Sequence, residues 1–176
     1  MKVYLIGFMG AGKSTIAPLI SDRIHLPWKD TDKIIENKAQ MEIPEIFKRR
    51  GEREFRNLER EAVQKVAQGE QSIVSLGGGA PLDDQNWNLI QSTGISFYLQ
   101  LSSEELLERI GDAQNRPLLE GMTEQERKKE VRNLLQERAP RYRRADHTIE
   151  SGGKAPAQIA SEITEILEVE KEEWNE

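Results

Sequence analysis

The stretch 7-GFMGAGKS-14 directly follows the apolar run 3-VYLI-6 near the start of the chain. It matches the pattern G-x-x-x-x-G-K-[ST], in which glycines let the backbone wrap closely around phosphate oxygens. Backbone N–H groups and the start of the following helix then face the anion. We therefore predict a strand over 2–6, a phosphate-binding loop, and a helix over about 12–23.

The end of this stretch contains two residues with separate expected roles. Lys13 can reach the outer phosphates of a nucleotide, and the Ser14 hydroxyl can bind Mg²⁺. Pro18 lies inside the helix that follows, where it cannot donate a hydrogen bond to the Ser14 carbonyl. We expect a kink or a local irregularity of the helix at Pro18.

The composition is that of one globular domain. The chain has 176 residues, of which 36% are hydrophobic and 32% are charged, and this length allows a substantial core. No apolar stretch approaches the roughly 20 residues of a membrane helix, and there is no cysteine, so we expect a cytoplasmic protein without a membrane partner. The net charge of −6 is concentrated in residues 161–176, which hold seven Glu and one Lys. Because no broad basic surface is indicated, we expect no nucleic-acid partner.

Strands and helices alternate along the rest of the chain. Apolar runs predict further strands over 72–76 and 95–101, 147-HTIE-150 is predicted as a last short strand, and 26-LPWKDTD-32 indicates a short extended segment. Helical spacing between these segments predicts helices, two of them short and separated near Pro44. This alternation favours a parallel sheet covered on both faces, with ligands at the carboxyl ends of the strands.

Two aspartates stand at the end of the extended segment. In extended geometry Asp30 and Asp32 share one face. One carboxylate can therefore hold Mg²⁺ while the other orients an acceptor hydroxyl and takes its proton. The alternative is that Asp32 caps a helix that begins near Lys33.

A run of three glycines, Gly77, Gly78 and Gly79, follows the strand predicted over 72–76. Such a run leaves backbone N–H groups exposed and allows a ligand to approach the chain closely. The alternative is a flexible turn without a ligand.

Three arginines are candidates for binding anions. Arg56 has Glu52 four residues before it, which favours an ordinary surface ion pair. Arg116 lies in the polar stretch 111–123, which is typical of a mobile loop and could close over a transferring phosphate. Arg138 ends a charged helix, where a cation also suits the helix dipole. These residues permit a kinase but do not identify its acceptor.

Seven pieces of the chain, in order and at approximately the same spacings, resemble the shikimate kinase family: GFMGAGKST, DTD, IPEIF, GEREFRNLE, SLGGGA, RPLL and ERAPRYR. The resemblance implies an α/β fold like that of the P-loop nucleoside monophosphate kinases. That fold is a three-layer sandwich with a five-stranded parallel sheet in the order 2-3-1-4-5, helices on both faces and a mobile lid. The resemblance also implies transfer of the γ-phosphate of ATP to the 3-hydroxyl of shikimate, with Mg²⁺, in chorismate and aromatic amino-acid biosynthesis.

The same resemblance implies roles for individual residues. It makes Lys13, Asp32 and Arg116 catalytic, and it makes Ser14 and Asp30 the metal-binding residues. The nucleotide-binding residues that it implies are Gly10, Ala11, Gly12, Lys13, Ser14, Thr15, Arg109 and Arg116. The substrate-binding residues that it implies are Asp32, Arg56, Gly77, Gly78, Gly79, Arg138, Phe47 and Phe55.

On this basis residues 1–176 form a single kinase domain, which we expect to be a monomer. Its parts are a substrate-binding segment over about 31–60, a lid over about 111–124 and an acidic, frayed tail over about 170–176. Two alternatives are kept open. One is a kinase of the same fold for another small hydroxy acid such as gluconate, and the other is a non-catalytic nucleotide-binding domain.

Overall fold

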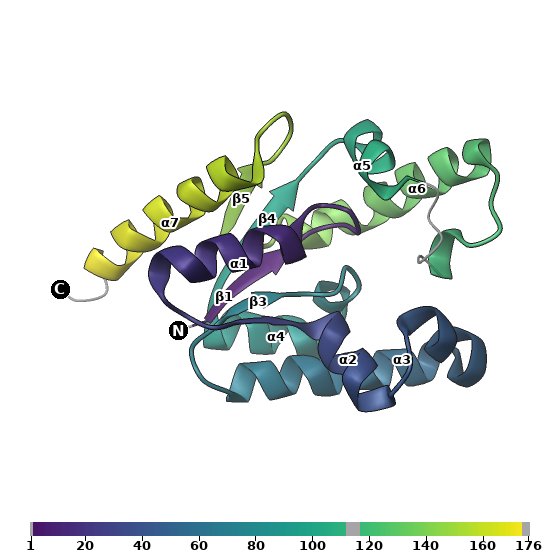
Figure 1. Ribbon diagram of the computed structural model, residues 1–176, viewed down its shortest axis with the longest axis horizontal. Helices are drawn as coiled ribbons and strands as arrows, with labels where there is room; N and C mark the ends of the chain where they lie inside the picture. Colours follow the sequence, from purple (N-terminus) through teal and green to yellow (C-terminus); the bar gives the residue numbers. More distant parts are fainter. Residues whose placement is uncertain (1, 112–116, 174–176) are drawn as a thin grey trace.

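A five-stranded parallel sheet forms the centre of the molecule (Figure 1). The computed structural model describes residues 2–111 and 117–173. The strands are β1 (Lys2–Ile6), β2 (Trp28–Asp30), β3 (Ile73–Ser75), β4 (Gly94–Gln100) and β5 (His147–Glu150). Their spatial order is β2-β3-β1-β4-β5, and each neighbouring pair is parallel. The expected order and strand direction are confirmed.

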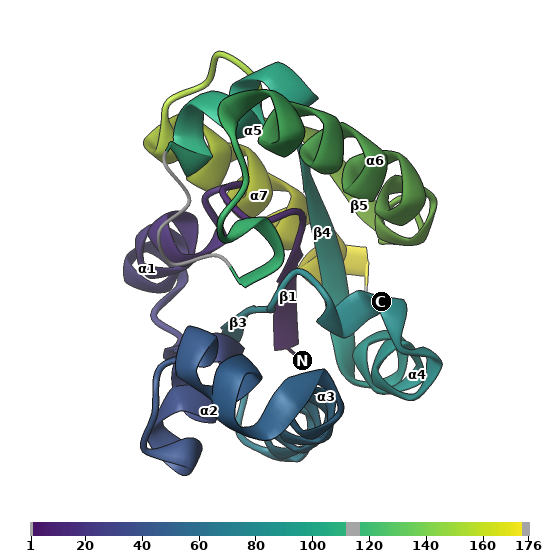
Figure 2. The ribbon, with the colours of Figure 1, turned by 90° about the vertical axis from the view of Figure 1, so that its right-hand side faces the viewer.

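Helices cover both faces of this sheet, as Figures 1 and 2 show. One face carries α1 (Lys13–Ile24) and α7 (Pro156–Glu173), which pack against each other. The other face carries α3 (Ile43–Gln68), α4 (Asp84–Thr93) and α6 (Glu124–Tyr142). Two shorter helices, α2 (Thr31–Ala39) and α5 (Ser103–Ile110), follow the carboxyl ends of β2 and β4. The expected three-layer fold is therefore confirmed.

The core follows from this layering. All residues of β1 and β3 are buried, because a parallel sheet covered on both faces exposes neither side of its central strands. A second, smaller cluster packs α2 against α3 and contains Ile35, Ala39, Ile46, Phe55, Leu58 and Ala62. This cluster holds the two helices of the segment over 31–60 against each other. Within the described ranges, no helix is both long enough and apolar enough to cross a membrane.

Two prolines lie in the parts of the chain where the sequence predicted disturbed or separated helices. Helix α1 continues through Pro18 as one helix. Proline at this point removes one backbone bond, to the carbonyl of exposed Ser14 in the first helical turn. The break expected near Pro44 is confirmed, because residues 40–42 separate α2 from α3 and Pro44 lies in the first turn of α3, where proline is tolerated. The backbone of α3 departs from helical geometry further on, at Gly51, with φ of 80°.

The loop expected over 111–124 is covered only in part. Residues 112–116 lie outside the described residues, and the stretch that follows begins with a short 3-10 helix, η2 (Pro117–Leu119). A second such helix, η1 (Ala80–Leu82), directly follows the three glycines.

Candidate active site

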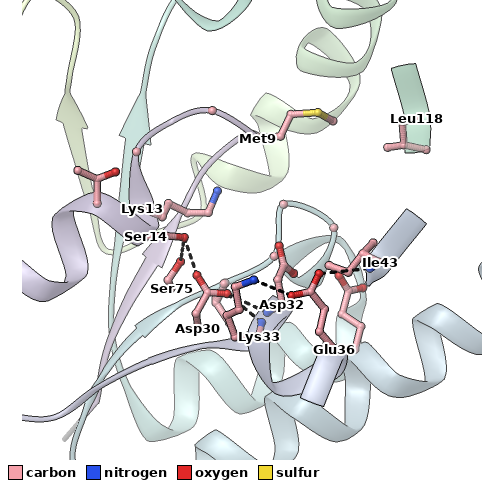
Figure 3. A pocket seen from close by; sticks show the side chains of 18 of the residues that line it. Met9, Lys13, Ser14, Asp30, Asp32, Lys33, Glu36, Ile43, Ser75 and Leu118 are labelled. Carbon is pink, nitrogen blue, oxygen red and sulfur yellow. Dashed lines mark hydrogen bonds and ion pairs between the residues drawn. The ribbon is translucent and has the colours of Figure 1, made fainter. Parts of the chain in front are cut away.

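A pocket of about 820 Å³ opens at the carboxyl ends of the strands. Its walls come from the phosphate loop, α2, the first half of α3, the glycine run and η2. Figure 3 shows Lys13, Ser14, Asp30 and Asp32 close together at one side, with Met9 and Leu118 across from them. The pocket therefore joins the segments that the sequence made candidates for binding the phosphate donor and the acceptor.

The loop between β1 and α1 has the backbone of a phosphate-binding loop. Gly7, Gly10 and Gly12 have φ of 154°, 81° and 93°, values that residues with a Cβ rarely adopt. The Lys13 ammonium donates to the carbonyls of Gly7 (2.8 Å) and Phe8 (3.0 Å), which keeps its long side chain folded against the loop. The loop is thus shaped to surround an anion, with the lysine already at its centre.

Ser14 and Asp30 meet below this loop. The Ser14 hydroxyl donates to Asp30 Oδ2 at 2.5 Å and lies 3.2 Å from the Ser75 hydroxyl at the end of β3. The other oxygen of Asp30 accepts from the backbone N–H groups of Asp32 (2.9 Å) and Lys33 (3.4 Å). Asp30 is therefore the cap of α2, and the alternative that Asp32 has this role is wrong.

Asp32 lies in the first turn of α2 with its carboxylate directed at the glycine run (Figure 3). A Cβ added to Gly77 would stand 2.6 Å from Asp32 Oδ1, so only glycine allows this close approach. Thr31, which is fully buried, holds the same turn because its hydroxyl accepts from the Gly77 N–H at 2.8 Å. Nothing in the local sequence signalled this role of Thr31, because Thr31 and Gly77 are 46 residues apart.

Arg56 projects from α3 into the pocket wall. Its guanidinium bonds Glu52 at 3.2 Å, as the spacing suggested, but also Glu59 at 2.8 Å. Glu59 is only 2% exposed, so this second pair belongs to the interior rather than to the surface. A Cβ added to Gly79 would collide with Arg56 Nη1, which shows how closely the arginine packs against the glycine run.

Arg138 reaches the same pocket from the end of α6. It is 7% exposed, and its guanidinium lies over the Phe8 ring, 5.7 Å from the centroid. The aromatic rings of Phe47 and Phe55, whose centroids are 4.6 Å apart, form part of the wall on the α3 side. Two arginines from distant helices thus border one pocket that also has an apolar wall.

Glu59 is a site residue that the sequence interpretation did not include. Its charge lies near both arginines, since Arg56 and Arg138 each favour its ionised form. The i+3 spacing from Arg56 was visible in the sequence, but the same spacing is common on exposed helices. Only its burial separates Glu59 from an ordinary surface glutamate.

The titration of Glu59 leads to a testable pH dependence. Burial raises the pKa of the Glu59 carboxyl above 4.5, although Arg56 and Arg138 oppose the rise. The folded protein therefore keeps this proton to a higher pH than the unfolded chain. The resulting stabilisation is complete below the unfolded pKa and is lost as the pH rises through the folded pKa. We expect the free energy of unfolding of the wild type, relative to Glu59→Gln, to fall as the pH rises through this interval.

Urea unfolding at a series of pH values between about 4 and 8 measures this difference. Glu61→Gln is the matched control, because Glu61 lies on the same helix, is 54% exposed and pairs with Lys38 at the surface. If the free energy of unfolding of the wild type minus that of Glu59→Gln stays constant or rises with pH, the raised pKa of Glu59 is contradicted.

Of the two arginines expected on the nucleotide side, the structure describes Arg109 but not Arg116. Arg109, at the end of α5, lines the pocket and approaches Gly12, where an added Cβ would lie 3.6 Å from Arg109 Nη1. Arg116 lies outside the described residues. The neighbouring Pro117 and Leu118 line the pocket.

Comparison with known proteins identifies the family. The shikimate kinase family model matches residues 9–168. The shikimate kinase of Thermodesulfovibrio yellowstonii is 36% identical over 167 residues, which is 95% of each chain. The chain belongs to the shikimate kinase family. Shikimate kinase from Moorella thermoacetica is 38% identical over 166 residues, covering 94% of each chain.

A solved structure agrees with this membership. Shikimate kinase from Acinetobacter baumannii in complex with shikimate superposes with a TM-score of 0.91 at 32% identity, covering 97% of this chain and 94% of that one. As a member of the shikimate kinase family, the chain is a phosphotransferase with a hydroxyl group as acceptor, and ATP is the co-substrate of the family.

Proposed function

We propose that this chain transfers the γ-phosphoryl group of ATP to the 3-hydroxyl of shikimate, the family's step in chorismate biosynthesis. The observation that carries the proposal is that residues suited to hold the phosphate donor and residues suited to hold the acceptor line the same pocket. The lining of this pocket includes both a phosphate-binding loop and a carboxylate, Asp32, with two arginines, Arg56 and Arg138. Shikimate kinase family members at 36–38% identity support the choice of acceptor over gluconate.

The acceptor half suits a small anion with hydroxyl groups. Arg56 and Arg138 would bind the shikimate carboxylate, because a planar guanidinium can hold a carboxylate through two hydrogen bonds. Glu59 would hold Arg56 in position, as their 2.8 Å bond indicates. Phe47 and Phe55 would pack against the ring of the acceptor, and the N–H groups of Gly77–Gly79 would supply further polar contacts.

Asp32 would act on the hydroxyl that receives the phosphoryl group. With the carboxylate of shikimate held by the arginines, the 3-hydroxyl would lie between Asp32 and the γ-phosphate. Its oxygen forms the new P–O bond while the bond from the γ-phosphorus to the bridging oxygen of ADP breaks, and the hydroxyl proton passes to Asp32. Because the transition state of phosphoryl transfer is loose, positioning supplies much of the rate enhancement.

The donor half would hold ATP through the loop residues Gly10–Thr15, with Lys13 at the outer phosphates. Ser14 and Asp30 would hold Mg²⁺, since a hydroxyl and a carboxylate 2.5 Å apart are hard oxygen donors of the kind that this ion prefers. The bound ion would neutralise phosphate charge. Arg109 would stack on the adenine, and Arg116 would contact the transferring phosphate as part of a lid.

The remaining parts of the proposal concern the whole chain. We propose a single kinase domain that acts as a cytoplasmic monomer, without nucleic-acid or membrane partners. The segment over 31–60 would bind shikimate, residues 111–124 would form the lid, and the chain would end in an acidic, frayed tail from about 170.

A panel of acceptors tests the proposed function. Purified protein with ATP and Mg²⁺ is assayed for ADP release with shikimate, with gluconate and without an acceptor. We expect release that depends on shikimate and is abolished by chelating Mg²⁺. Faster release with gluconate would support the alternative substrate, and ATP binding without any acceptor-dependent release would support a non-catalytic domain.

A further inference from the structure

The side chain of Tyr142, at the end of α6, lies directly behind the glycine run. It is fully buried, and its hydroxyl donates to the Gly78 carbonyl at 2.7 Å. Its ring packs against that of Tyr98, with centroids 5.4 Å apart. Tyr142 is absent from the pocket lining, whereas Gly78 and Gly79 are part of it. The tyrosine therefore contacts the turn without being part of the pocket lining.

The bonded carbonyl determines the direction of a neighbouring N–H group. The Gly78 carbonyl and the Gly79 N–H belong to one peptide unit, which is planar and trans, so the two groups point in opposite directions. When Tyr142 holds the carbonyl on its own side, the Gly79 N–H points to the other side. Gly79 itself packs against the Arg56 guanidinium, because a Cβ added to it would collide with Arg56 Nη1.

The N–H groups of this turn differ in their partners. The Gly77 N–H donates to Thr31 Oγ1 and the Ala80 N–H donates to the Gly77 carbonyl. Within residues 2–111 and 117–173, the Gly79 N–H has no hydrogen-bond acceptor, so it can donate to a ligand. The Gly79 N–H therefore lies next to the Arg56 guanidinium, the side chain proposed to bind the acceptor carboxylate.

We propose that Tyr142 is a positioning residue for the acceptor substrate, which keeps the Gly79 N–H directed at the carboxylate that Arg56 and Arg138 bind. This inference rests on the proposed function. A peptide between two glycines meets little steric resistance to rotation. Without the hydroxyl, the peptide can turn its carbonyl toward the pocket, where it repels the carboxylate and no longer donates to it. Arg138 is one helical turn before Tyr142, so α6 fixes both contacts together.

The hydroxyl is a donor throughout the range of an enzyme assay. Burial raises the pKa of Tyr142 to about 12, with the nearby Arg138 charge acting in the opposite direction. The hydrogen bond to Gly78 is therefore independent of pH under assay conditions.

Tyr142→Phe removes the hydroxyl and keeps the ring. We expect the KM for shikimate to rise about five- to tenfold, the loss typical of one hydrogen bond and its displaced partner, with the KM for ATP unchanged. Tyr98→Phe is the matched control, because Tyr98 is also buried, packs on the same ring and lies outside the pocket. Its KM for shikimate should equal that of the wild type.

The outcomes separate the two proposals. An inactive wild type would refute the proposed function. If the wild type is active and the KM of Tyr142→Phe for shikimate is within twofold of the wild-type KM, only the role of Tyr142 is refuted. An equal increase of the KM for shikimate and the KM for ATP in Tyr142→Phe, or a fall in kcat alone, would also overturn the role of Tyr142. If Tyr142→Phe is unstable, the dissociation constant for shikimate is measured below its unfolding transition, and an unchanged constant refutes the proposal.

Discussion

Asp32→Asn is expected to lower kcat by about 10²- to 10⁴-fold, the range typical of a lost general base, while ATP binding persists. The asparagine amide keeps the shape of the side chain and the close approach to Gly77, but it cannot accept the proton of the acceptor hydroxyl. Because Asp32 is not among the residues proposed to hold ATP or Mg²⁺, the contacts of the phosphate loop with ATP should persist. Steady-state assays with shikimate and ATP, together with calorimetric ATP titration, measure the two effects.

Asp22→Asn is the matched control for this substitution. Asp22 lies on α1 outside the pocket, so the same chemical change should leave kcat unaltered. Thermal unfolding of both variants shows whether either has lost stability. A stable Asp32→Asn protein that turns over shikimate at the wild-type rate would remove Asp32 from the mechanism.

Arg56→Lys is expected to raise the KM for shikimate by about 10- to 100-fold with a smaller change in kcat. Lysine retains the positive charge but loses the planar fork, so it cannot bond a carboxylate through two parallel N–H groups. The same change weakens the 2.8 Å bond to Glu59, which then remains buried beside a poorly placed partner. The KM for ATP should not change, because Arg56 belongs to the acceptor side of the pocket.

Arg49→Lys controls for the general effect of replacing arginine on this helix. Arg49 is also on α3, but its side chain is 64% exposed and pairs with Glu45 at the surface. Surface pairs of this type contribute little, so the KM for shikimate should be that of the wild type. If Arg56→Lys binds shikimate as tightly as the wild type does, the carboxylate is bound elsewhere.

Local sequence patterns predicted most of the architecture. The strand segments predicted from the sequence correspond to strands β1 to β5, and the resemblance correctly implied their order. Proline is tolerated in the first turn of a helix, which explains why Pro44 lies inside α3 and the break precedes it.

The sequence was less informative about which charged residues are buried. Arg56, Glu52 and Glu59 have the spacing of many exposed helical pairs, and nothing in that spacing separates Glu59 from Glu52. Burial depends on what packs against the helix, here the glycine run and Arg138 from α6. Such neighbours come from segments far away in the chain.

The sequence by itself determined that this chain has a phosphate-binding loop in a parallel α/β fold, because these features depend on short stretches of residues. Only the tertiary structure decided that Asp30, rather than Asp32, caps α2, that Glu59 is a buried partner of Arg56, and that Tyr142 holds the turn at Gly78. Tyr142 and Gly78 are 64 residues apart. Their contact arises because α6 packs against the segment that follows β3, which brings the last turn of this helix to the glycine run whatever their separation in the sequence.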